Sequence, residues 1–162
     1  MFMAYNISSL KRSKFFVASN VFPQTIAVVK TRAKPLNIEV IVADPESFKF
    51  EEEPEKFCGA LFQNPDNYGF LNDYIDLVAT LKKHKIITIL ATDLLALTQI
   101  KPPGEMGFDV AIGSAQRFGV PLGYGGPAAA FFATTDEYKR KIPGVGFTFI
   151  FFFLLLVNFF YS

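Results

Sequence analysis

The sequence has no tryptophan, one cysteine and one histidine. A lone Cys58 cannot build a disulfide framework or a cysteine metal cluster. His84 alone is too little for a histidine metal site or a catalytic triad, so no metal site is expected. Because 16 basic residues are balanced by 15 acidic ones, there is no charge excess that would favour nucleic acid as a partner.

The pattern of apolar residues predicts strands that alternate with helices. The expected strands are Lys14–Ala18, Glu39–Val42, Ala60–Gln63, Ile86–Leu90, Val110–Ile112 and Ala128–Phe132. The expected helices are Pro23–Arg32, a helix capped by Asn72 or Asp73 that runs to Lys83, a short turn at Asp93–Leu97, and a helix to Lys141 with a capping box of Thr134 and Glu137. This alternation is typical of an α/β domain with a largely parallel sheet.

Polar residues follow two of the expected strands. Thr92 and Asp93 come after Ile86–Leu90, and Ser114, Gln116 and Arg117 come after Val110–Ile112. In open α/β sheets, ligands gather at the carboxyl ends of the strands. We therefore expect a binding site at this edge.

Six short segments carry a family resemblance. They are Phe22–Thr25, Thr31–Ala33, Ala91–Thr98, Lys101–Glu105, Gly113–Gly119 and Tyr124–Pro127. In this order and spacing, they resemble the P-proteins of the glycine cleavage system over Ser13–Gly144. The resemblance implies a partial pyridoxal-phosphate (PLP)-dependent transferase-like large domain of the aspartate aminotransferase type, with a mostly parallel sheet flanked by helices.

The family resemblance also implies a function. P-proteins are oxidoreductases that decarboxylate glycine on PLP and pass the aminomethyl group to the lipoyl arm of the H-protein. Their C-terminal half carries the Schiff-base lysine, and their N-terminal half has the same fold without it. This chain resembles the middle of the N-terminal half, so its expected partners are the catalytic half, glycine and the lipoylated H-protein. The chain alone is expected to be inactive.

Gln116 stands where the lysine of the catalytic half would align, and an amide cannot form an imine. No catalytic residue is therefore expected here. The candidate cofactor-binding residues are Thr92, Asp93, Ser114, Arg117, Gly123, Gly125 and Gly126. Asp93 either pairs with a pyridinium nitrogen or caps the turn that follows it. Arg117 either binds a carboxylate or phosphate, or forms a structural ion pair between the halves.

The three candidate glycines lie in the loop Gly119–Pro127. Glycines allow backbone N–H groups to approach an anion closely. One hypothesis is that this loop lies against the PLP phosphate of the catalytic half. The alternative is a tight turn before the next strand.

The two ends of the chain suggest further expectations. The first residues lack an Arg-rich amphipathic stretch, so no targeting segment is expected, although the eukaryotic family is mitochondrial. Residues 145–162 depart from the family, contain no charge and include seven of the 20 phenylalanines. We expect a family domain over residues 1–144 and a non-homologous tail from a truncated or mis-spliced gene model. The alternative is a membrane-tethered, catalytically dead interaction module that uses the tail as its anchor.

Overall fold

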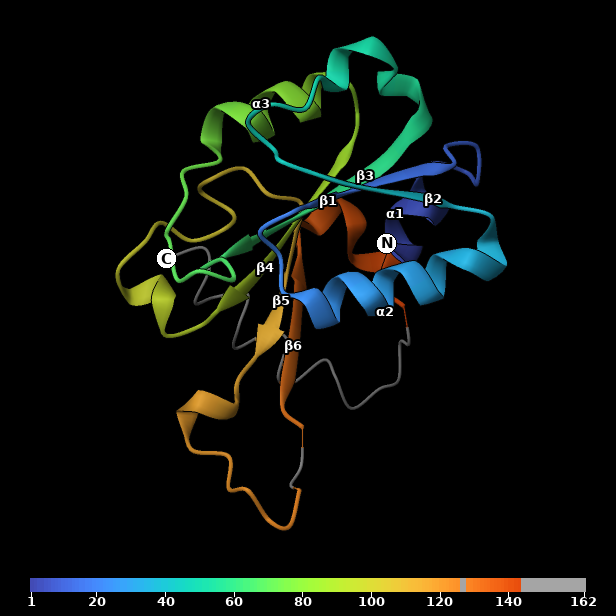
Figure 1. Ribbon diagram of the computed structural model, residues 1–162. Helices are drawn as coiled ribbons and strands as arrows, with labels where there is room; N and C mark the ends of the chain where they lie inside the picture. Colours follow the sequence, from blue (N-terminus) through green and yellow to red (C-terminus); the bar gives the residue numbers. More distant parts are fainter. Residues whose placement is uncertain (126–127, 144–162) are drawn as a thin grey trace.

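The computed structural model describes residues 1–125 and 128–143 and contains a single six-stranded sheet (Figure 1). The strands are β1 (Lys14–Ala18), β2 (Glu39–Ala43), β3 (Phe57–Asn64), β4 (Ile87–Asp93), β5 (Val110–Ser114) and β6 (Ala130–Thr134). Their order is β2-β1-β3-β4-β5-β6; β6 pairs antiparallel with β5, and the other pairs are parallel. The predicted α/β class with a mostly parallel sheet is confirmed.

Helices cover both faces of the sheet. The α-helices are α1 (Phe2–Ile7), α2 (Pro23–Ala33) and α3 (Ile75–Lys83). Figure 1 shows α3 on one side of the sheet and α1 and α2 on the other. Short 3₁₀ helices are η1 (Lys34–Leu36), η2 (Phe50–Glu52), η3 (Pro54–Lys56), η4 (Ala96–Thr98), η5 (Gln116–Phe118) and η6 (Asp136–Lys141). The chain therefore forms three layers, with the sheet in the middle.

Two helix starts differ from the sequence prediction. Thr134 ends β6, and its hydroxyl donates to the backbone oxygen of Asp109 at 2.8 Å, so the predicted capping box is wrong. Pairing of Thr134 with Val110 in the sheet takes precedence over the cap. Helix α3 has Tyr74 at its N-cap without a side-chain cap, although the Asp73 carboxylate accepts the Ile75 N–H at 3.0 Å.

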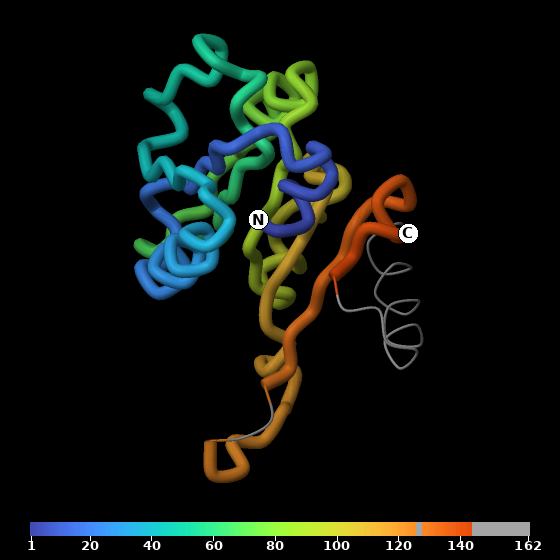
Figure 2. The backbone as a smooth tube through the Cα atoms, turned by 90° about the vertical axis from the view of Figure 1, so that its right-hand side faces the viewer, coloured from blue at the N-terminus to red at the C-terminus, as the bar shows by residue number. Residues whose placement is uncertain are grey.

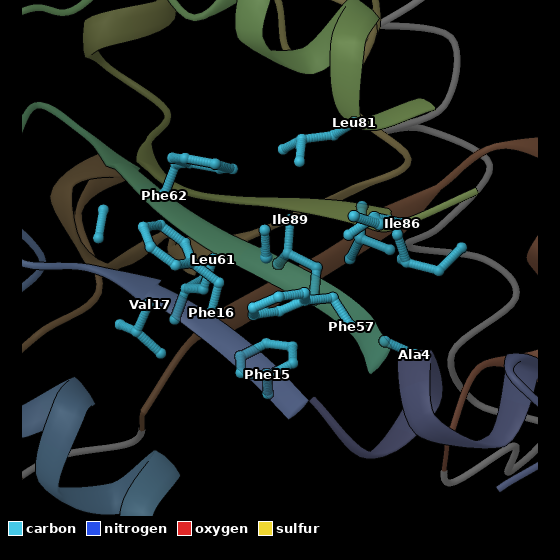
Figure 3. Close-up of a cluster of buried hydrophobic side chains, with 14 of the residues drawn as sticks. Ala4, Phe15, Phe16, Val17, Phe57, Leu61, Phe62, Leu81, Ile86 and Ile89 are labelled. Carbon is cyan, nitrogen blue, oxygen red and sulfur yellow. The ribbon is translucent and has the colours of Figure 1, made fainter. Parts of the chain in front are cut away.

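Aromatic side chains fill the core on the α3 side of the sheet. Phe16 is fully buried, and its ring centroid lies 4.6 Å from that of Phe50 and 4.9 Å from that of Phe48. Phe62 continues the cluster toward α3, where Leu81 is also buried (Figure 3). Such rings bury a large apolar area each, so this cluster is the main source of stability on this face.

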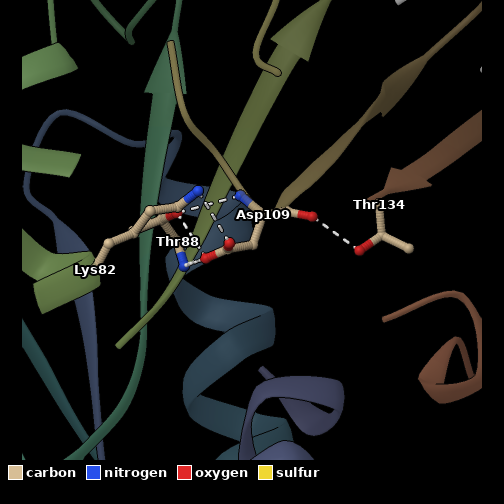
Figure 4. A network of polar contacts seen from close by, with 4 residues as sticks. All are labelled: Lys82, Thr88, Asp109 and Thr134. Atoms are coloured by element: carbon tan, nitrogen blue, oxygen red, sulfur yellow. Dashed lines mark hydrogen bonds and ion pairs between the residues drawn. The ribbon is translucent and has the colours of Figure 1, made fainter. Parts of the chain in front are cut away.

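Asp109 connects three strands and a helix at the amino edge of the parallel strands (Figure 4). Its buried carboxylate accepts the backbone N–H and the hydroxyl of Thr88 at 2.8 and 2.9 Å. The ammonium of Lys82 on α3 lies 3.4 Å from the other carboxylate oxygen. Together with the hydrogen bond from the Thr134 hydroxyl to the Asp109 backbone oxygen, these contacts fix the start of β5 against β4, β6 and α3.

We expect Asp109→Ala to lower the free energy of unfolding by about 3 kcal/mol, because the buried donors of Thr88 lose their acceptor. Urea titration of the 162-residue chain measures this loss. Asp136→Ala is the matched control, since Asp136 is exposed and has only an i,i+3 ion pair with Lys139; its effect should stay within about 0.5 kcal/mol. Equal losses in both variants would contradict the structural role of Asp109.

The predicted apolar tail lies outside the described residues. Within the described ranges, the longest α-helix is α2 with 11 residues, and no helix is long and apolar enough to cross a membrane. The division into a domain over residues 1–144 and a tail stays a prediction.

Candidate functional site

A pocket of about 710 Å³ opens at the carboxyl edge of the parallel strands. The ends of β3, β4 and β5, the start of α2, the segment after β5 and the start of β6 contribute to its wall. Its lining residues are Phe22, Thr25, Gln63, Asn64, Pro65, Asp66, Ala91, Thr92, Asp93, Ile112, Gly113, Ser114, Gln116, Arg117, Ala130 and Phe131. The structure thus brings the predicted residues Thr92, Asp93, Ser114, Gln116 and Arg117 to one pocket.

Asp93 and Arg117 form an ion pair across the ends of two strands. The Arg117 Nε lies 2.6 Å from the Asp93 Oδ2, while the Asp93 Oδ1 accepts the Leu95 N–H at 3.0 Å. The second contact is the turn-capping interaction expected as an alternative for Asp93. Because the Arg117 side chain is 62% exposed, the ion pair contributes at most about 1 kcal/mol to stability. The pair is therefore easily opened.

Thr92 and Asp93 are part of β4, which is longer than predicted. Successive strand residues point to opposite faces of the sheet, so the two side chains lie on different faces. Thr92 is buried, and its hydroxyl oxygen has no hydrogen-bond partner among the residues that the structure describes. Thr92 therefore belongs to the pocket wall rather than to the charged group around Asp93.

Ser114 organises the start of the segment after β5. Its hydroxyl lies 3.2 Å from the backbone oxygen of Ala129 and 3.3 Å from the Gln116 Oε1, and it accepts the Gln116 N–H at 3.2 Å. These contacts hold Gln116 at the pocket, next to Arg117 in the chain. The sequence predicted these residues individually, but not this network.

Gln63, Asn64 and Asp66 are pocket residues that the sequence analysis missed. The Gln63 side chain accepts the Phe22 N–H at 3.1 Å, which fixes the start of α2 at the pocket. Burial would raise the pKa of Asp66, but hydrogen bonds from Phe70, Tyr68, Asn72 and Asn20 outweigh it and lower the pKa. The signal that could have found Gln63 and Asn64 is their place at the end of an expected strand.

Of the predicted glycines, Gly123 and Gly125 are not among the residues that line this pocket. Gly123 and Gly125 have φ angles of 43° and 99°, and Gly126 lies outside the described residues. Figure 2 shows that residues 119–125, which follow η5, extend away from the body of the sheet. Leu122 and Tyr124 on this arm (residues 119–125) are almost fully exposed. Within this chain, the arm therefore does not contribute to the group around Asp93.

A second cavity, of about 570 Å³, opens at the opposite edge of the sheet. Arg12 lies beside it and donates through Nη1 to the backbone oxygens of Phe57, His84 and Lys85. Burial raises the pKa of the Cys58 thiol to about 11, so the thiol stays protonated at neutral pH. Across residues 1–125 and 128–143, no group of three or more His, Cys, Asp or Glu side chains could hold a metal ion.

Sequence comparisons identify the family. The model of the glycine cleavage system P-protein family matches residues 1–148. Proteins named glycine dehydrogenase (decarboxylating) from Synechocystis sp. and Roseobacter denitrificans are each 51% identical over 144 residues, which is 89% of this chain. The chain spans only 14% and 15% of the length of these relatives.

Structural comparisons agree with the sequence match. A crystal structure of a glycine decarboxylase (P-protein) in inhibitor-bound form has a TM-score of 0.76 and 27% identity, with 88% of this chain and 32% of that chain covered. A cystathionine gamma-lyase from Lactobacillus plantarum has a TM-score of 0.62 and 16% identity, with 85% and 37% covered, and shows the fold alone. The PLP-transferase-like fold and the matched segments together lead to one assignment: the chain belongs to the glycine cleavage system P-protein family.

Proposed function

We propose that this chain is part of the non-catalytic half of a glycine decarboxylase. The observation that carries the proposal is the chemistry of the pocket. No lysine is among its lining residues in the described ranges, and Gln116 stands two residues after Ser114, the last residue of β5. A carboxamide nitrogen is not nucleophilic enough to form an imine with an aldehyde. The chain would contribute its fold and its contacts to a second half that carries the lysine.

The pocket residues do not fit a covalently held PLP. An imine needs an amine, and the described lining offers the amide of Gln116 instead. The Asp93 carboxylate, which lies beside Arg117 and the Leu95 N–H, could pair with a pyridinium nitrogen, but a carboxylate does not attach the cofactor covalently. We therefore assign no step of PLP chemistry to this pocket.

In the whole protein, the remaining part would bind PLP and glycine and would pass the aminomethyl group to the lipoylated H-protein. The names of the relatives support the decarboxylation of glycine. The similarity of the fold to PLP-dependent enzymes supports the cofactor. A mitochondrial location of a eukaryotic member stays a prediction.

An activity assay of the purified chain tests the proposal. The chain is mixed with glycine, PLP and lipoylated H-protein, and release of carbon dioxide from glycine labelled at the carboxyl carbon is measured. We expect no release above a control without protein. Release that depends on the chain and on glycine would show that the chain has a complete site of its own.

The arm also has a proposed role, which is contact with the PLP phosphate of the catalytic half. We expect Gly125→Asp in the full-length protein to weaken PLP retention at least about tenfold, because a carboxylate would repel the phosphate. Gly125 has a φ of 99°, so any side chain strains the backbone there; Gly125→Ala is the control that carries this strain without the charge. If both variants retain PLP like the parent in equilibrium dialysis, the arm does not contact the phosphate.

A further inference from the structure

The pocket at the carboxyl edge presents one positive and one negative charge that a ligand can reach. Three of its lining side chains are charged, namely Asp66, Asp93 and Arg117. Four hydrogen-bond donors already surround the Asp66 carboxylate. Among the described residues, Asp93 and Arg117 are therefore the charged pair that is available to a ligand.

The side-chain amides of Gln63 and Asn64, which also line the pocket, already have hydrogen-bond partners. Gln63 bridges the Phe22 N–H and the Pro65 backbone oxygen, both at 3.1 Å. Asn64 exchanges two hydrogen bonds with the backbone of Asn72, at 2.9 and 3.0 Å. These side chains build the wall, and the Asp93–Arg117 pair supplies the charged groups that a polar ligand can meet.

This ion pair selects the charge of the ligand. A simple anion at Arg117 would also meet the Asp93 carboxylate, and a simple cation at Asp93 would meet the guanidinium. A zwitterion satisfies both, since an ammonium group can replace the guanidinium beside Asp93 while a carboxylate takes the planar donors of Arg117. The exposure of the Arg117 side chain leaves room for this exchange.

An apolar surface adjoins the charged pair. Ala91 pairs with Ile112 in the β4–β5 register, and Asp93 pairs with Ser114 on the same face of the sheet. Phe22 at the start of α2 also lines the pocket and is partly exposed. A pocket of about 710 Å³ has room for a ligand side chain in addition to its charged head.

We propose that this pocket binds an α-amino acid with an apolar side chain, with its ammonium on Asp93 and its carboxylate on Arg117. Binding is non-covalent, because the described lining contains no lysine to form an imine. The proposal does not depend on catalysis in the other half, and its failure would leave the proposed function unchanged.

The test measures binding of leucine to the full chain without PLP, by isothermal titration calorimetry. Isocaproate and isoamylamine are leucine without its amino group and without its carboxylate, respectively. We expect leucine to bind at least about tenfold more tightly than either, because a charge-assisted hydrogen bond is lost with each group. Glycine should bind more weakly than leucine. Equal binding of leucine and isocaproate would overturn the zwitterion site, and equal binding of leucine and glycine would overturn the apolar subsite.

Substitutions locate the binding site. Asp93→Asn and Arg117→Gln should each weaken leucine binding about tenfold, and Arg117→Lys should have a smaller effect because the charge remains. Lys139→Gln is the matched control, since it breaks an exposed ion pair outside the pocket. Circular dichroism confirms that each variant is folded. Leucine binding that is unchanged in folded Asp93→Asn and Arg117→Gln would overturn the proposal.

Discussion

Gly113→Ala is expected to lower the free energy of unfolding by at least about 4 kcal/mol. Gly113 lies in β5 opposite Thr92 of β4. An added Cβ would collide with the backbone oxygen of Thr92 and would lie 2.6 Å from the Cε1 of Phe131. The Thr92 oxygen cannot move aside without separating β4 from β5. The Phe131 ring is buried and belongs to β6, where Phe131 pairs with Gly113, so it cannot move without disturbing the β5–β6 pair.

Urea titration of the variant measures the loss, and Gly119→Ala serves as its control. Gly119 has a φ of 100° and nothing within 4 Å of an added Cβ. The Gly119→Ala variant therefore adds backbone strain of about 1–2 kcal/mol without a collision. A Gly113→Ala variant as stable as Gly119→Ala would show that β4 and β5 are not packed as described.

Phe16→Ala is expected to lower the free energy of unfolding by about 4 kcal/mol. The Phe16 ring contacts those of Phe48, Phe50 and Phe62, so truncation leaves a cavity that neighbouring rings on separate elements cannot all fill. Urea titration of the Phe16→Ala variant measures this loss of unfolding free energy.

Phe118→Ala is the matched control for Phe16→Ala, because Phe118 is an exposed phenylalanine on η5. We expect its effect on the free energy of unfolding to stay within about 0.5 kcal/mol. If the two variants lost equal stability, the aromatic cluster would not be the centre of the core.

Much of the fold could be predicted from local sequence patterns. The strand Lys14–Ala18 and the helix from Pro23 have the predicted bounds to within one residue. Both carry a strong local signal, which is a buried apolar run in one case and a proline at the first helical position in the other. Local patterns are reliable where burial and propensity agree.

Other elements depend on contacts that are distant in sequence. The first three residues of β3, Phe57–Gly59, were not predicted as strand, because they follow directly on a polar run and become buried only between β1 and β4. Helix α1 was not predicted; its buried residues Met3 and Ala4 pack into the core that includes β3. Tertiary packing decides such segments.

The candidate site shows the same limit. The sequence pointed to Asp93 and Arg117 separately, since each follows an expected strand. Their ion pair depends on the register that places Asp93 beside Ser114, and this register cannot be derived from either segment alone. The amides of Gln63 and Asn64 enter the pocket for the same reason.

We infer that the cofactor-binding lysine of the whole protein lies outside this chain. The most direct measurement loads the full-length protein that contains this chain with equimolar PLP, reduces the imine with borohydride and maps the modified peptide by mass spectrometry. We expect one pyridoxyl-lysine, located outside residues 1–143. A pyridoxyl group on Lys101, Lys139 or another lysine of this range would contradict it.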